Sequence, residues 1–511
     1  MITSYKTLYS KVICPAIQVR PRERYDEARH PITWSIMARD EYHTAKGIDT
    51  IMCEYFRMAR IGRPKDVPNA PVVPHRGRPM KLAMSGTMFE GSPRDLLGHF
   101  IDTVDERWWQ FDLRMLKCTP ENLMELAKEY EKIVVAYGSA VSNKSRKKLN
   151  LCIRQYTRKL NAQLSLFLIR RTGQDKFFNY TIVPLPPMNV MALACQTPIQ
   201  WLESIENYAA LTQRELAANH ATAMENWLRK GRQGPEPELR NGLARSSTGY
   251  FLRLAADFAA IPNLHNKYPE WTFHADEVYR IDWDSVPEDN FYLVHLKTLI
   301  DSSTKIQRLE KILASMSKKS KDWIAKGERK EKMVLATAYP AVLGILYLYF
   351  KKYQRDWKVV MISASSKMSI KKRIDVINGF CGREDSPYYA SAFEADILLS
   401  TTPCVGTGLN LVIASHVVLF DLLWMRKDQE QAFCRVHRYP QTRETKLYLL
   451  HSPGNPIERD CLKRQSTRGQ LGEMTWQVTT GEAEAEQLKL KAQRRAEEKA
   501  GFHGIEMKIA V

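Results

Sequence analysis

Two adjacent acids near the start of the chain have the types and the position to act on a phosphorylated ligand. Asp40 and Glu41 follow the short apolar run 32–38, which is typical of a buried strand. Open α/β sheets bind ligands at the carboxyl ends of their strands. One carboxylate there can hold Mg²⁺ through its water shell, and the second can polarise an attacking water. Acidic pairs are also common on protein surfaces, so the pair by itself is a weak signal.

The segment 431–441 carries two arginines that could face such a ligand. On a helix, Gln431, Arg435 and Arg438 are spaced i, i+4 and i+7, so they line one narrow stripe beside an apolar arc. Planar guanidinium groups on a cleft wall can neutralise the charge on a transferring phosphoryl group. The alternative is a surface helix whose arginines lie over packed apolar residues, and the segment taken alone favours that alternative.

A third candidate is the turn that follows Thr401 and Thr402. This hydroxyl pair ends an apolar run, and Gly406 and Gly408 form a Gly-x-Gly turn soon after it. Glycine lets the backbone approach a ligand closely. The same spacing also occurs in ordinary turns, so the turn alone does not define a site.

Apolar patterning indicates the elements that must position these residues. Between 291 and 465, apolar runs alternate with helical patterns, which predicts a parallel sheet covered on both faces. The predicted strands are 333–337, 359–363, 397–400, 417–420 and 446–450. Residues 1–115 contain two shorter apolar runs, 32–38 and 81–84, and are also predicted to be α/β in type.

Residues 116–290 are predicted to be mainly helical, because apolar residues recur at helical spacing in 121–137, 201–227 and 248–258. The run 144–159 has seven lysines and arginines and no acid, which fits either a solvated helix face or contact with a polyanion. From residue 481 the chain is rich in Glu, Lys, Arg and Ala, which is typical of a solvated helix.

Composition limits the classes of function. The 511 residues include 76 lysines and arginines against 57 acids, a net charge of +19 that favours nucleic acid as a partner over an anionic membrane. The nine cysteines form no Cys-x-x-Cys pair or zinc-type cluster, as expected of a reduced intracellular protein without a zinc-binding reader domain. No signal peptide is evident, and prolines interrupt the uncharged stretches 177–202 and 333–350, so we expect no membrane segment.

Taken in order, these segments resemble those of the Swi/Snf-type superfamily-two helicase-like ATPases, which translocate on double-stranded DNA. The match includes the Asp-Glu-x-His box, the Ser-Gly-Thr-Pro motif and the final two motifs, of which 397–441 is the most specific part. The stretches that carry the resemblance are 1–8, 34–46, 82–100, 166–172, 302–313, 369–380 and 397–450.

The resemblance implies an α/β fold with two RecA-like lobes, the first incomplete, and a mainly helical insertion. It implies ATP in the cleft between the lobes, DNA across their surface and a nuclear location with a role in chromatin remodelling or DNA repair. The expected division is 1–115 for the partial first lobe, 116–290 for the insertion, 291–470 for the second lobe or helicase C-terminal domain, and 471–511 for a charged helical tail.

The same resemblance assigns roles to single residues. Asp40 would hold Mg²⁺ and Glu41 would activate the attacking water. Arg435 and Arg438 would be arginine fingers that reach ATP from the second lobe. The other matched residues are Gly408 and Gln431 for nucleotide binding, His437 for support of the arginine helix, Ser85 and Thr87 for coupling between lobes, and Thr401 and Thr402 for DNA contact.

The chain also departs from the family. The phosphate-binding loop Gly-x-x-x-x-Gly-Lys-Ser/Thr should precede the acidic box, but only 39 residues precede Asp40 and no Gly-Lys dipeptide occurs anywhere in the sequence. That loop provides the backbone cradle and the lysine for the β- and γ-phosphates. Met88, Val405 and Tyr42 stand where the family usually has proline, glycine and alanine.

Three hypotheses follow from this match and its departures. The chain is an ATP-driven translocase on double-stranded DNA, or it is a catalytically inactive remnant that binds DNA or acts as a scaffold. In the third, Met1 is a misassigned start and the active enzyme begins upstream.

Overall fold

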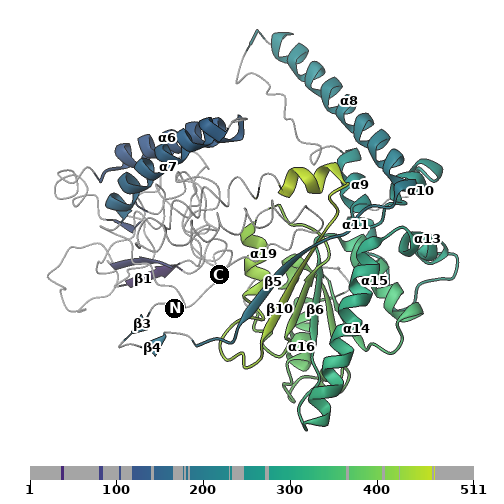
Figure 1. Ribbon diagram of the computed structural model, residues 1–511. Coiled ribbons are helices and arrows are strands. Elements are labelled where there is room, and N and C mark those ends of the chain that lie inside the picture. Colours follow the sequence, from purple (N-terminus) through teal and green to yellow (C-terminus); the bar gives the residue numbers. More distant parts are fainter. Residues whose placement is uncertain are drawn as a thin grey trace, which may run out of the picture. The chain divides into compact units, whose positions relative to one another are not determined.

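The chain forms two compact units in this computed structural model (Figure 1). The smaller unit comprises Met1–Arg171 with Ser466–Arg495, and the larger comprises Thr172–Gln465 with Ala496–Val511. The structure describes residues 36–39, 80–84, 100, 103–104, 118–139, 143–164, 176–177, 180–181, 184–229, 231–232, 247–270, 275–363, 368–405, 409–424, 426–462 and 465.

The larger unit is built on one six-stranded parallel sheet with the order β5-β10-β9-β6-β8-β7. Its strands are β5 (Met188–Ala194), β6 (Met333–Thr337), β7 (Val359–Ile362), β8 (Ile397–Thr401), β9 (His416–Leu419) and β10 (Thr445–His451). Strands β6 to β10 coincide with the five predicted strands to within one residue at each end. The predicted α/β class and its parallel sheet are therefore confirmed.

Helices bury both faces of this sheet. Successive side chains of a strand point to opposite faces. Leu335 of β6 accordingly packs in one core with α14 (Thr304–Ala325) and α15 (Pro340–Tyr353). Its neighbour Val334 packs in a second core with α16 (Ile370–Phe380). Two buried faces explain why every residue of β6, β8 and β9 is buried and why most of them are apolar.

Local signals set where these helices begin. Pro340 occupies the first turn of α15, where its missing N–H costs no hydrogen bond. Ser303 and Ser369 cap α14 and α16, and their hydroxyl oxygens accept the backbone N–H groups three residues further on. The larger unit also contains α9 (Ser247–Ala255), α10 (Ile261–Lys267), α11 (Ala275–Val278), α12 (Phe291–Val294), α13 (Leu296–Asp301), α17 (Tyr389–Phe393), α18 (Thr402–Val405), α19 (Arg426–Phe433), β3 (Lys176–Phe177) and β4 (Tyr180–Thr181).

Strand β5 was not predicted. It lies at the edge of the sheet and pairs with β10 over seven residues, from Met188 opposite Thr445 to Ala194 opposite His451. Only Val190 and Ala192 in β5 are buried, so the strand lacks the continuous apolar pattern of the central strands. We expected 116–290 to be a helical insertion, but β5, α8 (Ile199–Arg229) and the helices α9 to α11 belong to the same compact unit as residues 291–465.

Helix α8 (Ile199–Arg229) is the longest described helix of the larger unit and extends away from the sheet in Figure 1. Its buried residues, Ile205, Tyr208, Ala209 and Thr212, all lie in its first half. The helix is therefore anchored to the unit at one end, next to α9 and α10.

The smaller unit contains a parallel pair of strands and a pair of helices. Strands β1 (Ile36–Arg39) and β2 (Met80–Ala83) pair in parallel, as expected for α/β material. Helices α6 (Pro120–Ser139) and α7 (Asn143–Leu164) pack through buried apolar side chains and the rings of Tyr130 and Tyr156, whose centroids are 5.6 Å apart. In the basic run of α7, Arg158 and Lys159 are exposed, as both interpretations of this run require.

Within the described ranges, no helix is both long enough and apolar enough to span a bilayer. The described part of the chain also holds no cluster of three or more His, Cys, Asp or Glu side chains that could bind a metal ion. The cysteines it describes are all free thiols. Several predicted features lie outside the described residues, namely Asp40, Glu41, Ser85, Thr87, Gly408 and the tail 471–511.

Candidate functional site

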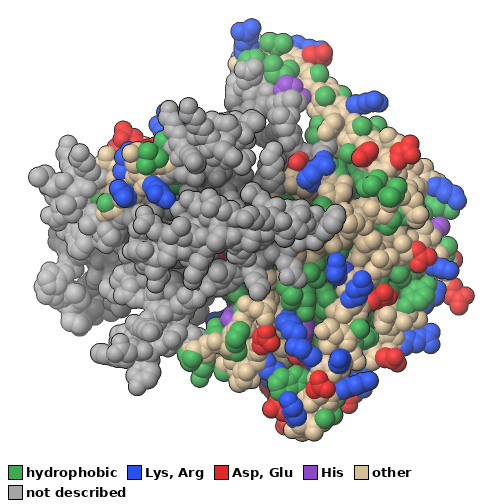
Figure 2. All heavy atoms as spheres, viewed as in Figure 1, with side chains coloured by type: hydrophobic (Ala, Val, Ile, Leu, Met, Phe, Trp, Pro, Cys, Tyr) green, Lys and Arg blue, Asp and Glu red, His purple; other side chains and the backbone are tan. Residues whose placement is uncertain are grey.

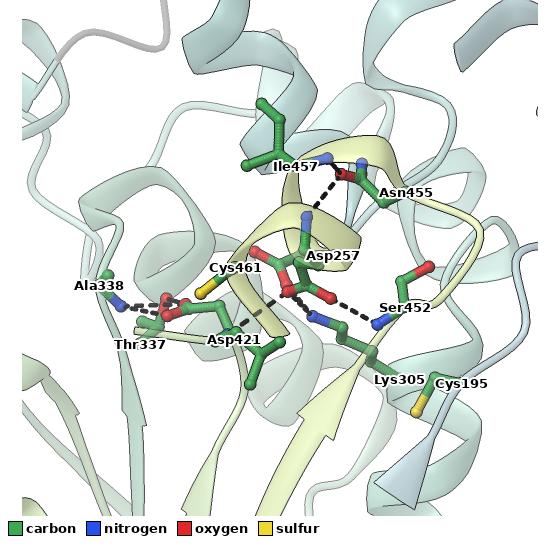
Figure 3. Close-up of polar contacts among 12 residues, drawn as sticks. Cys195, Asp257, Lys305, Thr337, Ala338, Asp421, Ser452, Asn455, Ile457 and Cys461 are labelled. Atoms are coloured by element: carbon green, nitrogen blue, oxygen red, sulfur yellow. Dashed lines mark hydrogen bonds and ion pairs between the residues drawn. The ribbon is translucent and has the colours of Figure 1, made fainter. Parts of the chain in front are cut away.

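The carboxyl ends of the central strands carry a cluster of buried polar residues (Figure 3). Thr337 ends β6, and Asp421 follows the end of the adjacent strand β9. The Thr337 hydroxyl donates to one Asp421 carboxylate oxygen, and the Ala338 N–H donates to both, at 3.0 and 2.9 Å. Burial raises the pKa of Asp421 to about 6, although these hydrogen bonds partly oppose the shift.

Lys305 lies beside this pair and joins three segments of the larger unit. Its Nζ is 2.8 Å from Asp257 Oδ1, between α9 and α10, and 2.7 Å from Glu458 Oε1, after β10. The Lys305 side chain is 1% exposed. Burial alone would lower the pKa of Lys305, but the two carboxylates outweigh burial and raise it. Burial raises the pKa of Asp257, against the opposing effect of Lys305.

This cluster has a structural role, because it connects the ends of neighbouring strands. Glu458 also accepts hydrogen bonds from the backbone N–H groups of Leu422 and Ser452, and therefore ties the end of β9 to the end of β10. Its members are almost fully buried, so they offer no surface on which a ligand could bind in this conformation. The cluster holds the carboxyl edge of the sheet together and is not arranged as an acid–base site.

The two predicted arginine fingers lie in a turn beyond the end of α19. We predicted that Gln431, Arg435 and Arg438 share one helical stripe; this is wrong, because α19 ends at Phe433. The Val436 N–H bonds to the Phe433 carbonyl at 3.0 Å, which tightens the chain from α-helix into turn. We call residues 434–440 the arginine turn.

The arginine turn is not helical because contacts with other segments of the larger unit fix its backbone. Its Val436 side chain is fully buried, and the Arg435 carbonyl accepts the N–H of Leu411 at 2.8 Å. Pro440 at the end of the turn cannot donate to a helical ladder and disfavours helical backbone in the residue before it. These constraints leave Arg435 with 9% exposure and Arg438 exposed.

The arginine turn contacts the segment that leads into β9. We call residues 409–415 the entry loop. Besides the Leu411 bond, the side chain of Gln441, which directly follows the arginine turn, donates to carbonyls of the entry loop. His437 Nδ1 lies 2.8 Å from the Thr445 hydroxyl at the start of β10, which supports the turn from its other side. Two stretches singled out from the sequence, near 401–411 and at 431–441, therefore meet in the fold.

The predicted DNA-contacting hydroxyls lie at the junction of β8 and α18. Thr401 is 1% exposed and its hydroxyl donates to Cys404 Sγ at 3.3 Å. Thr402 is 7% exposed, and its hydroxyl oxygen has no hydrogen-bond partner among the described residues. Contact with DNA through these two residues stays a prediction.

The meeting of the arginines with Asp40 and Glu41 across a cleft also stays a prediction, because the two acids lie outside the described ranges. Within the larger unit, sequence reasoning missed Lys305, Asp257, Asp421 and Glu458. Lys305 is 48 residues from Asp257 and 153 from Glu458, so no local pattern could have paired them. Gln441 lay inside a segment that we singled out, but its spacing alone gave it no role.

The charges of the described residues on one face of the larger unit are dispersed. On the face drawn in Figure 2, the Lys and Arg side chains of the described residues are interspersed with Asp and Glu and do not gather in one patch. The basic surplus of the chain therefore does not by itself mark a nucleic-acid surface on this face.

Strands β6 to β9 and the arginine turn lie in a part of the chain that matches a known domain family. Residues 304–440 match the helicase conserved C-terminal domain. The predicted resemblance to the Swi/Snf-type helicase-like ATPases is confirmed, and residues from α14 to the arginine turn form the matched domain.

Particular relatives come from DNA repair and chromatin remodelling. The chain is 31% identical over 148 residues to "DNA repair and recombination protein RAD54-like" of Gallus gallus, covering 29% of this chain and 18% of the relative. It is 29% identical over 189 residues to "ISWI chromatin-remodeling complex ATPase ISW2" of Saccharomyces cerevisiae, covering 37% of this chain and 15% of the relative. The chain thus spans less than a fifth of the length of these relatives.

One solved structure, that of the C-terminal part of the Fun30 ATPase domain, is 18% identical in sequence. It covers 58% of this chain and 100% of its own chain, with a TM-score of 0.34.

Proposed function

We propose that this chain is part of an ATP-dependent motor that couples ATP hydrolysis to movement on double-stranded DNA, in nuclear chromatin remodelling or DNA repair. The observation that carries the proposal is the arginine turn. Within the helicase conserved C-terminal domain, Arg435 and Arg438 are presented on a hydrogen-bonded turn instead of a mobile surface helix. Backbone bonds to the Arg435 and Arg438 carbonyls fix the positions from which the two side chains extend, and such an anchored start suits arginine fingers.

In the proposed reaction, a water attacks the γ-phosphorus of ATP, and the bond from that phosphorus to the bridging oxygen breaks. ADP leaves with the electron pair of that bond. Glu41 accepts a proton from the water, while Arg435 and Arg438 donate hydrogen bonds to phosphate oxygens as charge accumulates on them. Asp40 would hold Mg²⁺, which draws charge from the same oxygens when bound.

Double-stranded DNA is the proposed track. The net charge of +19 supports a polyanionic partner. Contacts to phosphates would make binding insensitive to sequence and strongly weakened by salt.

The alternative is a DNA-binding or scaffolding protein that does not turn over ATP. It is favoured by one observation, the lack of any Gly-Lys dipeptide and hence of a phosphate-binding loop within the 511 residues. In this alternative the arginine turn is a structural remnant of the family.

ATP hydrolysis by the purified chain, with and without duplex DNA, separates the two. We expect DNA-stimulated turnover that falls about 10³-fold or more in Arg435→Ala, the range for a lost arginine finger. Arg355→Ala is the matched control. Arg355 is an exposed arginine that precedes β7, and β7 is the edge strand at the end of the sheet opposite β5 and β10. Arg355→Ala should retain the wild-type rate. Salt-sensitive DNA binding without turnover in the wild type would establish the alternative instead.

A further inference from the structure

The side chain of Gln441 connects the arginine turn to the entry loop. Its Nε2 donates to the carbonyls of Val412 and Ala414 in the entry loop, at 3.0 and 2.9 Å, and to that of Val436 in the arginine turn, at 3.1 Å. Its Oε1 accepts the N–H groups of Thr442 and Arg443, at 3.1 and 3.0 Å. The residue is 7% exposed, so water does not replace these bonds.

The chemistry of this position requires an amide of this length. An amide nitrogen has two protons, and here they serve three carbonyls, so at least one proton is shared. A glutamate would direct a carboxylate at the same carbonyls, and asparagine is one carbon too short. Methionine has nearly the same length and shape as glutamine but has neither the donors nor the strong acceptor.

The bonds of Gln441 act together with a second connection to the same turn. The N–H of Leu411 donates to the carbonyl of Arg435 at 2.8 Å, and the N–H of Gln441 donates to the carbonyl of Arg438 at 2.7 Å. Both arginine carbonyls therefore accept backbone N–H groups, and the Gln441 side chain bonds to the entry loop and to the arginine turn at once.

We propose that Gln441 is a positioning residue for Arg435 and Arg438, which sets where their guanidinium groups lie relative to the entry loop. The inference rests on the proposed function, in which the two arginines stabilise the transferring phosphoryl group. Gln441 acts through the arginines and touches no nucleotide itself. Transition-state stabilisation by a guanidinium is sensitive to displacements of about 1 Å, so a loosened turn lowers the rate of reaction while the nucleotide still binds.

The first test measures the connection without any need for activity. Hydrogen exchange is followed at single amides in the wild-type chain, Gln441→Met and Gln429→Met. Gln429 is the matched control, because it is a glutamine 3% exposed in α19 whose amide donates to one carbonyl, that of Leu423, at 3.4 Å. We expect exchange at the Leu411 N–H to become about tenfold faster in Gln441→Met and to stay unchanged in Gln429→Met.

Leu411 is the decisive amide because its acceptor belongs to Arg435 and not to Gln441. If Gln441 only filled its own site, Leu411 would exchange at the wild-type rate, and the inference would be overturned. Amides of β6 and α15, in the centre of the unit, show in the same experiment that each variant is folded.

The second test separates this inference from the proposed function. The affinities for ADP and for ADP with aluminium fluoride, which mimics the transferring phosphoryl group, are compared in the presence of duplex DNA. In Gln441→Met we expect an unchanged affinity for ADP and a loss of about tenfold or more for the mimic, as in Arg435→Ala. Gln429→Met should match the wild type.

Two results would overturn the proposal in different ways. If Arg435→Ala loses affinity for the mimic and Gln441→Met does not, the arginines act on the nucleotide but Gln441 does not position them. If Arg435→Ala also binds the mimic as the wild type does, the proposed function itself fails and this inference fails with it.

Discussion

Replacing Lys305 by methionine should strongly destabilise the larger unit, because Lys305 is the buried cation of a charged cluster. Lys305 is the cation that neutralises Asp257 and Glu458, at 2.8 and 2.7 Å. Each contact is worth about 6 kcal/mol in Coulomb energy at an effective dielectric constant of about 20. Desolvation of the buried charges offsets most of that energy, so the pairs add little net stability.

Truncation of Lys305 has a larger effect than this net value, because it leaves two buried carboxylates without a cation. The second oxygen of Asp257 already has no hydrogen-bond partner among the described residues. Loss of one partner of a buried ion network costs about 3–5 kcal/mol. For a unit of this size that lowers the midpoint of thermal unfolding by about 6–20 °C.

The assay is thermal and urea unfolding at pH 7 of the wild type, Lys305→Met and Lys311→Met. Lys311 is the matched control, because it is an exposed lysine on the same helix. Asp257→Asn should cost less than Lys305→Met, since Glu458 still neutralises the lysine. If Lys305→Met and Lys311→Met unfold within about 1 kcal/mol of each other, Lys305 is not the buried cation of this cluster.

Three further predictions concern single buried positions. Because the pKa of Asp421 is raised to about 6, its contribution to stability is complete below pH 3.8 and is lost as the pH rises through 6. Asp421→Asn should remove that dependence, a change of about 3 kcal/mol in urea unfolding between pH 4 and 7. Burial and nearby lysines lower the pKa of His416 to about 3, so stability falls as the pH drops below 6.5, and His416→Phe should be less sensitive to acid. Gly344→Ala should destabilise by about 1–3 kcal/mol or more, because the new Cβ would lie 2.0 Å from a ring carbon of Trp283.

Each of these predictions has a clear contrary result. An Asp421→Asn profile parallel to that of the wild type from pH 4 to 7 would show that Asp421 titrates normally. Equal acid sensitivity in His416→Phe and the wild type would mean that another group causes the acid unfolding. A Gly344→Ala variant with the wild-type midpoint would show that the ring of Trp283 does not pack against α15.

The central strands were predictable because a strand that is buried on both faces has apolar side chains at most successive positions, and such a run can be recognised in the sequence. β6 is buried at each of its five residues, and it was predicted with its observed bounds. β5 was not predictable in this way, because an edge strand has one exposed side and prolines flank it. Its partner β10 identifies it in the structure, and pairing between residues 188 and 445 leaves no local signal.

The arginine turn shows a limit of helical periodicity. Apolar spacing continues through Val436, so the pattern predicts a helix that extends past Phe433. The helix ends because the Arg435 carbonyl bonds to Leu411 and because Pro440 follows, and only the second of these is visible in the sequence. The residue types at the site were therefore predictable, whereas their geometry depends on contacts between distant segments.

The ion pairs of Lys305 with Asp257 and Glu458 could not be predicted from the sequence for a related reason. Buried charges cannot be told from exposed ones by residue type, and Lys305 occupies a helix whose other lysines are mostly on the surface. Its partners come from segments on either side in the chain, between α9 and α10 and after β10. Only the assembled sheet brings the three together.

In the proposed function, Glu41 and Arg435 take part in the hydrolysis of the same ATP molecule. The most direct test is a double-variant cycle in the rate of DNA-stimulated ATP hydrolysis, with Glu41→Gln, Arg435→Ala and the combination. Groups that act as one catalytic unit have strongly non-additive effects, so the combined variant should be about as slow as the slower single variant. Losses that multiply, or a wild-type rate in Arg435→Ala, would contradict the claim.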